Sequence, residues 1–124
     1  MVLYEFATAA DENPDVIGWA PEAGSVLIEC KLSRSDFLRD ATKGVRKNPR
    51  AGMGQRRYYM CPSDVIQVKD LPSKWGLLWV TNREVSVKRE ARGFPERNLL
   101  AEVRFLSSML RRAQVRIGSR PLSE

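Results

Sequence analysis

Apolar and polar positions in the first third of the chain predict three β-strands. The apolar runs cover residues 2–7, 15–20 and 26–32. Turn-forming residues separate them, Asp-Glu-Asn-Pro at 11–14 and Pro-Glu-Ala-Gly at 21–24, and such clusters mark the ends of strands. The short connections predict a three-stranded meander.

The middle of the chain predicts a helix, a loop and three more strands. Ser33 fits an N-cap, with Asp36 in the first turn of a helix that runs to about residue 43. Residues 43–57 contain three glycines and one proline, which favour a loop over a helix. A short strand follows at 57–61, residues 63–68 are ambiguous, and strands at 76–81 and 85–89 flank a hairpin turn.

The last predicted element is an amphipathic helix bounded by Pro95 and Gly118. Its apolar face recurs at spacings of three and four, at Leu99, Val103, Leu106, Leu110 and Ala113. We expect this face to pack on the sheet, with a dimer seam as the alternative. The chain therefore predicts one domain over residues 1–124, of mixed α/β class, with helices packed against a central sheet.

The amino-acid composition excludes several classes of catalytic and metal site. The chain has 124 residues, a net charge of +6, two cysteines and no histidine. Without histidine, Ser-His-Asp and Cys-His triads and imidazole metal sites are excluded. No apolar run reaches the roughly 18 residues of a membrane helix, and the N-terminus lacks a signal-peptide layout, so we expect a cytoplasmic protein. We expect Cys30 and Cys61 to be small buried hydrophobes rather than a redox pair.

Basic residues gather in the predicted loop. Residues 43–57 hold six of them and no acid, namely Lys43, Arg46, Lys47, Arg50, Arg56 and Arg57. One interpretation is a solvated face. The other is a surface that follows a phosphate backbone, with Tyr58 beside it and Arg34 near the preceding helix.

Strand 26–32 carries the candidate chemistry. Side chains alternate along a strand, so Glu29 and Lys31 share one face. We expect the other face to be buried, with Val26, Ile28, Cys30 and Leu32. Asp15 opens the preceding strand, and hairpin pairing brings it near Glu29 and Lys31. Two carboxylates and an ammonium then converge at one edge of the sheet.

Phosphodiester hydrolysis can use this set of groups. Mg²⁺ prefers oxygen ligands and is typically held by one or two carboxylates together with a substrate phosphate. A lysine can orient or deprotonate the attacking water. No histidine is required.

The same residues resemble a known signature. Pro14-Asp15 followed by Glu29-Cys30-Lys31 resembles the PD-(D/E)xK motif of the restriction-endonuclease-like nuclease superfamily. The segment ECKLSRSDFLRD (29–40) is similar to MmcB-like DNA-repair proteins and related bacteriophage proteins, as are GQRRYYMCP (54–62) and Pro72–Leu77. The similarity spans about residues 3–81.

The resemblance implies a fold and a metal site. The superfamily core is αβββαβ, and its N-terminal helix is absent from this sequence. Asp15, Glu29 and the Cys30 carbonyl would bind Mg²⁺ or Mn²⁺, and Lys31 would be the catalytic lysine. Glu5 is a candidate second-metal or water-mediated ligand.

We therefore expect a metal-dependent nuclease that hydrolyses DNA and reads structure or backbone rather than sequence. A branched-DNA or Holliday-junction resolvase in DNA repair or phage DNA processing fits by analogy, and a homodimer stays open. The alternative is a module of the same fold that binds nucleic acid or protein and does not cut.

Overall fold

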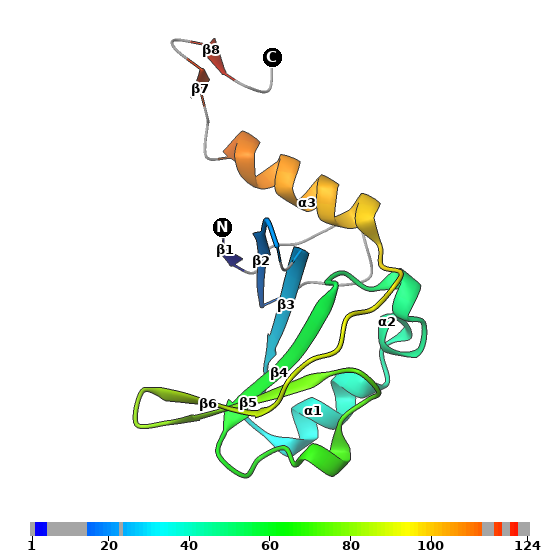
Figure 1. Ribbon diagram of the computed structural model, residues 1–124, viewed down its shortest axis with the longest axis vertical. Coiled ribbons are helices and arrows are strands. Elements are labelled where there is room, and N and C mark those ends of the chain that lie inside the picture. The colour runs from blue at the N-terminus through cyan, green and yellow to red at the C-terminus, as the bar shows by residue number, and fades with distance from the viewer. Residues whose placement is uncertain (1, 5–14, 23, 113–115, 118–119, 122–124) are drawn as a thin grey trace.

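A six-stranded sheet forms the centre of the molecule (Figure 1). The computed structural model describes residues 2–4, 15–22, 24–112, 116–117 and 120–121. The strands lie in sequence order: β1 (Val2–Tyr4), β2 (Val16–Ala20), β3 (Gly24–Cys30), β4 (Arg56–Pro62), β5 (Gly76–Thr81) and β6 (Glu84–Arg89).

The sheet is mixed. Strands β1, β2 and β3 pair antiparallel, β3–β4 and β4–β5 pair parallel, and β5–β6 pair antiparallel. The predicted meander and the hairpin are confirmed, and the hairpin turn is Asn82–Arg83, because Thr81 already pairs with Glu84. Parallel neighbours need a crossover, which here consists of α1 (Arg34–Ala41), α2 (Gly44–Lys47) and the 3₁₀-helix η1 (Pro49–Ala51) between β3 and β4. The 3₁₀-helix η2 (Val68–Asp70) lies between β4 and β5.

Among the described residues, three further elements follow the sheet. Helix α3 (Leu99–Arg112) crosses near β2 and β3 in Figure 1, and the strands β7 (Arg116–Ile117) and β8 (Arg120–Pro121) pair with each other. Together these elements make a mixed α/β fold with helices flanking a central sheet, as the sequence predicts.

The core lies between one face of the sheet and the helices. Leu27 and Tyr59 point from β3 and β4 into this core and are fully buried. Phe37 of α1 meets the Tyr59 ring edge-on at 4.9 Å between centroids. Phe105 of α3 lies 6.4 Å from Trp19 of β2. Helices α1 and α3 therefore pack on the same face.

The buried face of β3 is the opposite of the predicted one. Leu27 and Glu29 are buried, whereas Val26 and Ile28 are half-buried and Leu32 is 80% exposed. The helices cover the face that carries Glu29, because partners from that side satisfy its carboxyl group. An apolar run alone does not show which side the helices take.

The two cysteines differ for the same reason. Cys61 is buried on the core face of β4, as expected, but Cys30 points to the other face and is exposed. The expectation that Cys30 is a buried hydrophobe is therefore wrong.

Helix α3 is rotated relative to its predicted face. Leu99 and Val103 are 54% and 52% exposed, and Ala101, Glu102 and Phe105 are buried instead. Glu102 is held inside because its carboxylate accepts hydrogen bonds from Trp19 Nε1 at 3.2 Å and from the Gly54 amide at 2.9 Å. Hydrogen bonding to a buried acid thus sets the helix orientation. The predicted boundary residues Ala113 and Gly118 lie outside the described residues.

The start of α1 matches its prediction, whereas the basic segment does not. The Ser33 hydroxyl accepts a hydrogen bond from the Asp36 amide at 3.2 Å and caps α1. Residues 44–47 and 49–51, predicted as loop, form α2 and η1. Pro49 stands at the first position of η1, where its missing N–H is tolerated.

Within the described residues, no helix has the length and apolar character needed to cross a membrane.

Candidate active site

Asp15 lies beside the end of β3. It comes immediately before β2, whose Val16 pairs with Ile28 of β3. The Cys30 amide donates a hydrogen bond to Asp15 Oδ2 at 2.7 Å. The structure thus brings Asp15 next to the strand end that carries Glu29 and Lys31, as the hairpin register predicts.

Glu29 is buried on the core face of β3. Only 2% of it is exposed, and its Oε1 accepts a hydrogen bond from Arg46 Nη2 at 3.0 Å. Burial raises the pKa of Glu29 to about 8, against the opposing charge of Arg46, and the nearby Asp40 and Asp15 carboxylates raise it further. Glu29 therefore holds its proton near neutral pH unless another cation approaches.

Asp40 of α1 lies beside Glu29 and contacts three cationic side chains. It is buried, and its Oδ2 accepts a hydrogen bond from Arg46 Nε at 2.9 Å. Its Oδ1 lies 3.4 Å from Lys31 Nζ and 3.2 Å from Lys43 Nζ. Burial opposes its ionisation, but the hydrogen bond and charge of Arg46, then Tyr59 and Lys31, hold the pKa of Asp40 well below its usual range. Asp40 is thus the ionised centre of the cluster.

Aromatic side chains form the floor of this cluster. The Tyr59 hydroxyl donates a hydrogen bond to Asp40 Oδ2, and burial together with the Asp40 charge raises the pKa of Tyr59. The Tyr59 ring stacks on Trp75 at 4.4 Å, and the Arg46 guanidinium lies 4.9 Å from the Trp75 ring centroid. Tyr59 and Trp75 both belong to the hydrophobic core.

The sequence analysis singled out Lys31, Lys43 and Arg46 but not the carboxylate that joins them. One signal could have found Asp40. It stands three residues after Phe37 in α1, on the face that Phe37 buries, and residues three apart share a helix face. An acid on a buried helix face needs cationic partners.

A hollow opens beside the cluster. Its volume is about 230 Å³. It is lined by Cys30, Lys31, Asp36, Arg39, Asp40 and Lys43. The Lys31 side chain is 14% exposed and that of Lys43 is 45% exposed. Both lysines therefore line the hollow and stay accessible to solvent.

The candidate ligands for a divalent cation are two carboxylates and one carbonyl. Among the described residues, no group of three or more carboxylate, thiol or imidazole side chains is arranged to hold a metal. Asp15 and Glu29 supply two carboxylates, which with the Cys30 carbonyl would suffice for Mg²⁺ together with a phosphate oxygen and water. Glu5, the other candidate ligand, lies outside the described residues, as does Pro14.

Two of the six basic residues in 43–57 are buried, which corrects the expectation of an exposed loop. The Arg46 side chain is 1% exposed between Glu29 and Asp40. Arg57 is also 1% exposed. Its guanidinium donates to the carbonyls of Gly54 and Pro49, each at 2.8 Å. Both arginines stabilise the α2–η1 segment rather than extend into solvent.

The other predicted nucleic-acid contacts are spread over the surface. Arg34 forms a two-pronged ion pair with Asp70, with N–O distances of 2.8 and 2.9 Å. The Tyr58 hydroxyl donates to Glu90 at 2.8 Å. Several are exposed basic side chains: Lys43, Lys47, Arg50 and Arg56. Of these, Lys43 lies in the candidate site and Arg50 pairs with Glu96.

The comparisons with known proteins identify a fold relative without a known activity. No model of a known protein family matches the chain, and no curated protein matches it. The solved structure of a protein of unknown function from Silicibacter pomeroyi superposes with a TM-score of 0.66 at 25% sequence identity. The match covers 91% of this chain and 76% of that chain. It supports the mixed α/β fold over nearly the whole chain.

Proposed function

We propose that the protein is a metal-dependent nuclease that hydrolyses DNA at the end of β3. The observation that carries the proposal is the contact between Asp15 and the Cys30 amide. It brings the two acids of the motif-like pattern, Asp15 and Glu29, to one strand end together with Lys31. The resemblance to the PD-(D/E)xK signature supports the same assignment.

Each residue at the site has a separate role in the proposed reaction. Asp15, Glu29 and the Cys30 carbonyl would hold Mg²⁺ or Mn²⁺, which when bound stabilises negative charge on the phosphate and acidifies a water. Lys31 orients the attacking water and stabilises charge on the phosphate. Asp40 keeps the Lys31 ammonium in position, because its Oδ1 lies 3.4 Å from Lys31 Nζ.

The surroundings favour a polyanionic substrate. Three cations, Lys31, Lys43 and Arg46, surround the Asp40 carboxylate. Two of these cations line or border the hollow, so a phosphate there meets net positive charge. Contacts of this kind recognise backbone and shape, and branched DNA is the substrate class we place first.

Cleavage assays test the proposal directly. Plasmid, single-stranded and four-way-junction DNA are incubated with the protein and Mg²⁺ or Mn²⁺, with EDTA as the blank. We expect metal-dependent cutting that Lys31→Ala and Asp15→Asn reduce at least a hundredfold, in the range typical for the loss of a catalytic group. Asp15→Asn keeps an oxygen that can accept the Cys30 amide hydrogen bond, so it spares the local structure.

Lys69→Ala is the matched control. Lys69 is an exposed lysine in η2, and it does not line the candidate site. Cutting that survives Lys31→Ala as well as it survives Lys69→Ala would refute the assignment. DNA binding without any cutting by wild type would instead support the non-cleaving module, which the existing Glu29–Arg46 contact favours because Arg46 already occupies an oxygen of the Glu29 carboxyl group.

A further inference from the structure

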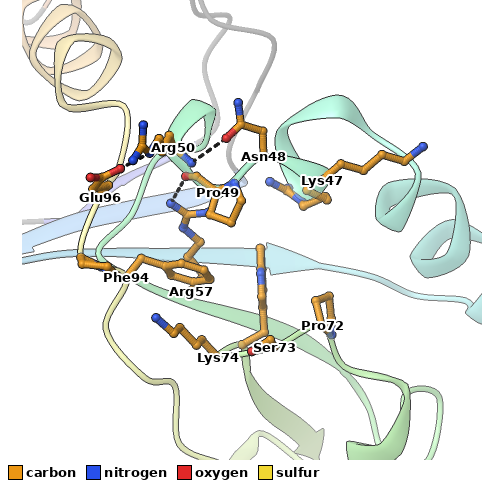
Figure 2. A pocket seen from close by; sticks show the side chains of 13 residues that line it. Lys47, Asn48, Pro49, Arg50, Arg57, Pro72, Ser73, Lys74, Phe94 and Glu96 are labelled. Atoms are coloured by element: carbon orange, nitrogen blue, oxygen red, sulfur yellow. Dashed lines mark hydrogen bonds and ion pairs between the residues drawn. The ribbon is translucent and has the colours of Figure 1, made fainter.

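The arginines of a basic pocket beside the candidate site already have partners within the chain. The pocket has a volume of about 410 Å³, and Arg46, Arg50 and Arg57 are among the residues that line it. Figure 2 shows that Arg50 pairs with Glu96 and that Arg57 donates to the Pro49 carbonyl. Arg46 is held by the acids of the candidate site. These arginines therefore stabilise the chain itself, unlike the charged side chains of β6.

Strand β6 forms one edge of the central sheet. It is the last strand in the order β1 to β6, and among the described strands it pairs with β5 alone. In Figure 1 the β5–β6 hairpin extends beyond the neighbouring strands at one side of the molecule. Residues 84–88 are all exposed. An exposed edge of this kind can add another strand through main-chain hydrogen bonds.

The register of the hairpin shows which backbone groups of β6 face outward. Asn82–Arg83 form the turn, both with positive φ, and Thr81 pairs with Glu84 across it. The first pair beside a two-residue turn of this type is hydrogen-bonded, and the pairs then alternate along the strands. The N–H and C=O groups of Val85 and Val87 therefore point away from β5, toward the open edge.

The sequence of β6 is self-complementary in one antiparallel register. When two copies pair about a two-fold axis at Ser86, Val85 of each copy lies opposite Val87 of the other, so their outward backbone groups can bond. The same register places Glu84 of each copy opposite Lys88 of the other. Facing apolar side chains and facing opposite charges both stabilise a strand pair. The match is reciprocal, as a two-fold interface requires.

Neighbouring registers lose this match. A shift by one residue places the outward backbone groups opposite groups that already bond to β5. A shift by two residues places Glu84 opposite either Ser86 or Glu90 of the second copy. In the self-complementary register Arg83 falls opposite Arg89, but Arg83 belongs to the turn, where the chain leaves the line of the strand. Charge therefore favours the register centred on Ser86.

The two faces of β6 are arranged for this contact. Val85 and Val87 are 56% and 52% exposed, and the β-bulge of the hairpin lies beyond them, at Lys88. The Lys88 ammonium lies 4.8 Å from the Trp79 ring centroid, on the opposite face of the strand from the valines. Glu84, on the same face as Lys88, forms no ion pair with any described residue. Its carboxylate is available to a second copy.

We propose that two copies of the chain associate through β6, antiparallel about Ser86, and join two six-stranded sheets into one. The inference does not depend on the proposed nuclease activity. Because the contact is one short strand from each copy, its area is small and the association is reversible. We expect a monomer at low concentration and a dimer at high concentration.

Sedimentation velocity of the full chain, from low-micromolar to near-millimolar concentration, measures the association. Glu84→Lys and Lys88→Glu each replace both facing ion pairs with like charges, and we expect each to weaken the dimer about tenfold. Combining the two substitutions in one chain restores opposite charges and should restore the dimer. An equal mixture of the two single variants should form a heterodimer for the same reason.

Glu22→Lys is the matched control. It makes the same charge change at an exposed acid between β2 and β3, away from β6. We expect it to leave the association unchanged. Amide hydrogen exchange followed by NMR then locates the contact: the Val85 and Val87 amides should become protected as concentration rises. The Ser86 amide, which faces β5, should be protected equally at every concentration.

Each outcome decides the inference. Protection of Val85 and Val87 that rises with concentration, together with rescue in the mixture, supports it. A protein that stays monomeric at near-millimolar concentration overturns it. A dimer that neither charge reversal weakens, or that the mixture does not restore, also overturns it and assigns the contact to another surface, such as the exposed Leu100 and Val103 of α3.

Discussion

Arg46 Nη2 lies 3.0 Å from Glu29 Oε1, and the Nε of the same arginine lies 2.9 Å from Asp40 Oδ2. One guanidinium thus joins an acid on β3 to an acid on α1. The three side chains are each at most 3% exposed. The bridge ties the crossover between two parallel strands to the strand that carries the candidate chemistry.

Removing the guanidinium is expected to destabilise the fold strongly. Arg46→Met keeps much of the aliphatic stem but leaves Asp40 ionised and buried with one partner fewer. Breaking a buried pair in this way typically lowers the free energy of unfolding by about 3–5 kcal/mol. Urea unfolding measures it. The control is Arg39→Ala, whose side chain is 78% exposed and lies 3.8 Å from Asp36. A change below about 1 kcal/mol in Arg46→Met would contradict the bridge.

The pH dependence of the free energy of unfolding should reveal the titration of the Glu29 carboxyl group. Its pKa is about 8 in the folded protein and 4.5 in the unfolded chain. Between these values the unfolded chain releases a proton that the folded protein retains. The stability that the protonated carboxyl contributes is therefore complete below pH 4.5 and is lost as pH rises to about 8, by up to about 1.4 kcal/mol per pH unit.

The composition makes this measurement selective, because the chain has no histidine to titrate in the same window. Thermal unfolding from pH 5 to pH 8 should show a falling midpoint in wild type. Glu29→Gln removes the titrating group and should flatten the profile. An equal slope in both proteins would show that another group is responsible.

The Tyr59 hydroxyl is expected to contribute to stability through Asp40. Tyr59→Phe removes the hydrogen bond to this buried carboxylate and keeps the ring stacked on Trp75. We expect a loss of about 1–3 kcal/mol in the free energy of unfolding, since the acceptor stays buried. Tyr58→Phe is the neighbouring control, because its hydroxyl bonds to the exposed Glu90. Equal effects of the two substitutions would refute the role of Asp40.

Sequence patterns predicted the positions of the helices and strands better than they predicted which face of each element is buried. Strand alternation, turn residues and the Ser33 cap gave the meander, the hairpin and the start of α1 correctly. Both errors of orientation, in β3 and α3, concern elements whose buried face carries an acid. Hydrophobic periodicity places Glu29 and Glu102 outside, whereas Arg46, Trp19 and the Gly54 amide hold them inside.

The candidate site was predictable only in part. The Asp15 contact follows from hairpin register, which depends on residues close in sequence. The position of Arg46 depends on how the α1–α2 crossover folds back over β3, and a string of basic residues does not encode that. The short helices α2 and η1 formed where glycine and proline favoured a loop, because Arg57 binds the Pro49 carbonyl and fixes that segment.

Gly76 and Gly93 form a matched pair that tests the close packing of β4, β5 and the segment that follows β6. A Cβ at Gly76 would collide with the Tyr58 ring and lie 2.7 Å from the Ala91 backbone nitrogen, whereas a Cβ at Gly93 would have no heavy atom within 4 Å. Gly76→Ala should lower the free energy of unfolding by about 1–3 kcal/mol, as overpacking does. Gly93→Ala should change it by less than about 0.5 kcal/mol. Chemical denaturation of both variants makes the comparison, and a Gly76→Ala protein as stable as Gly93→Ala would mean that the Tyr58 ring moves aside at little cost.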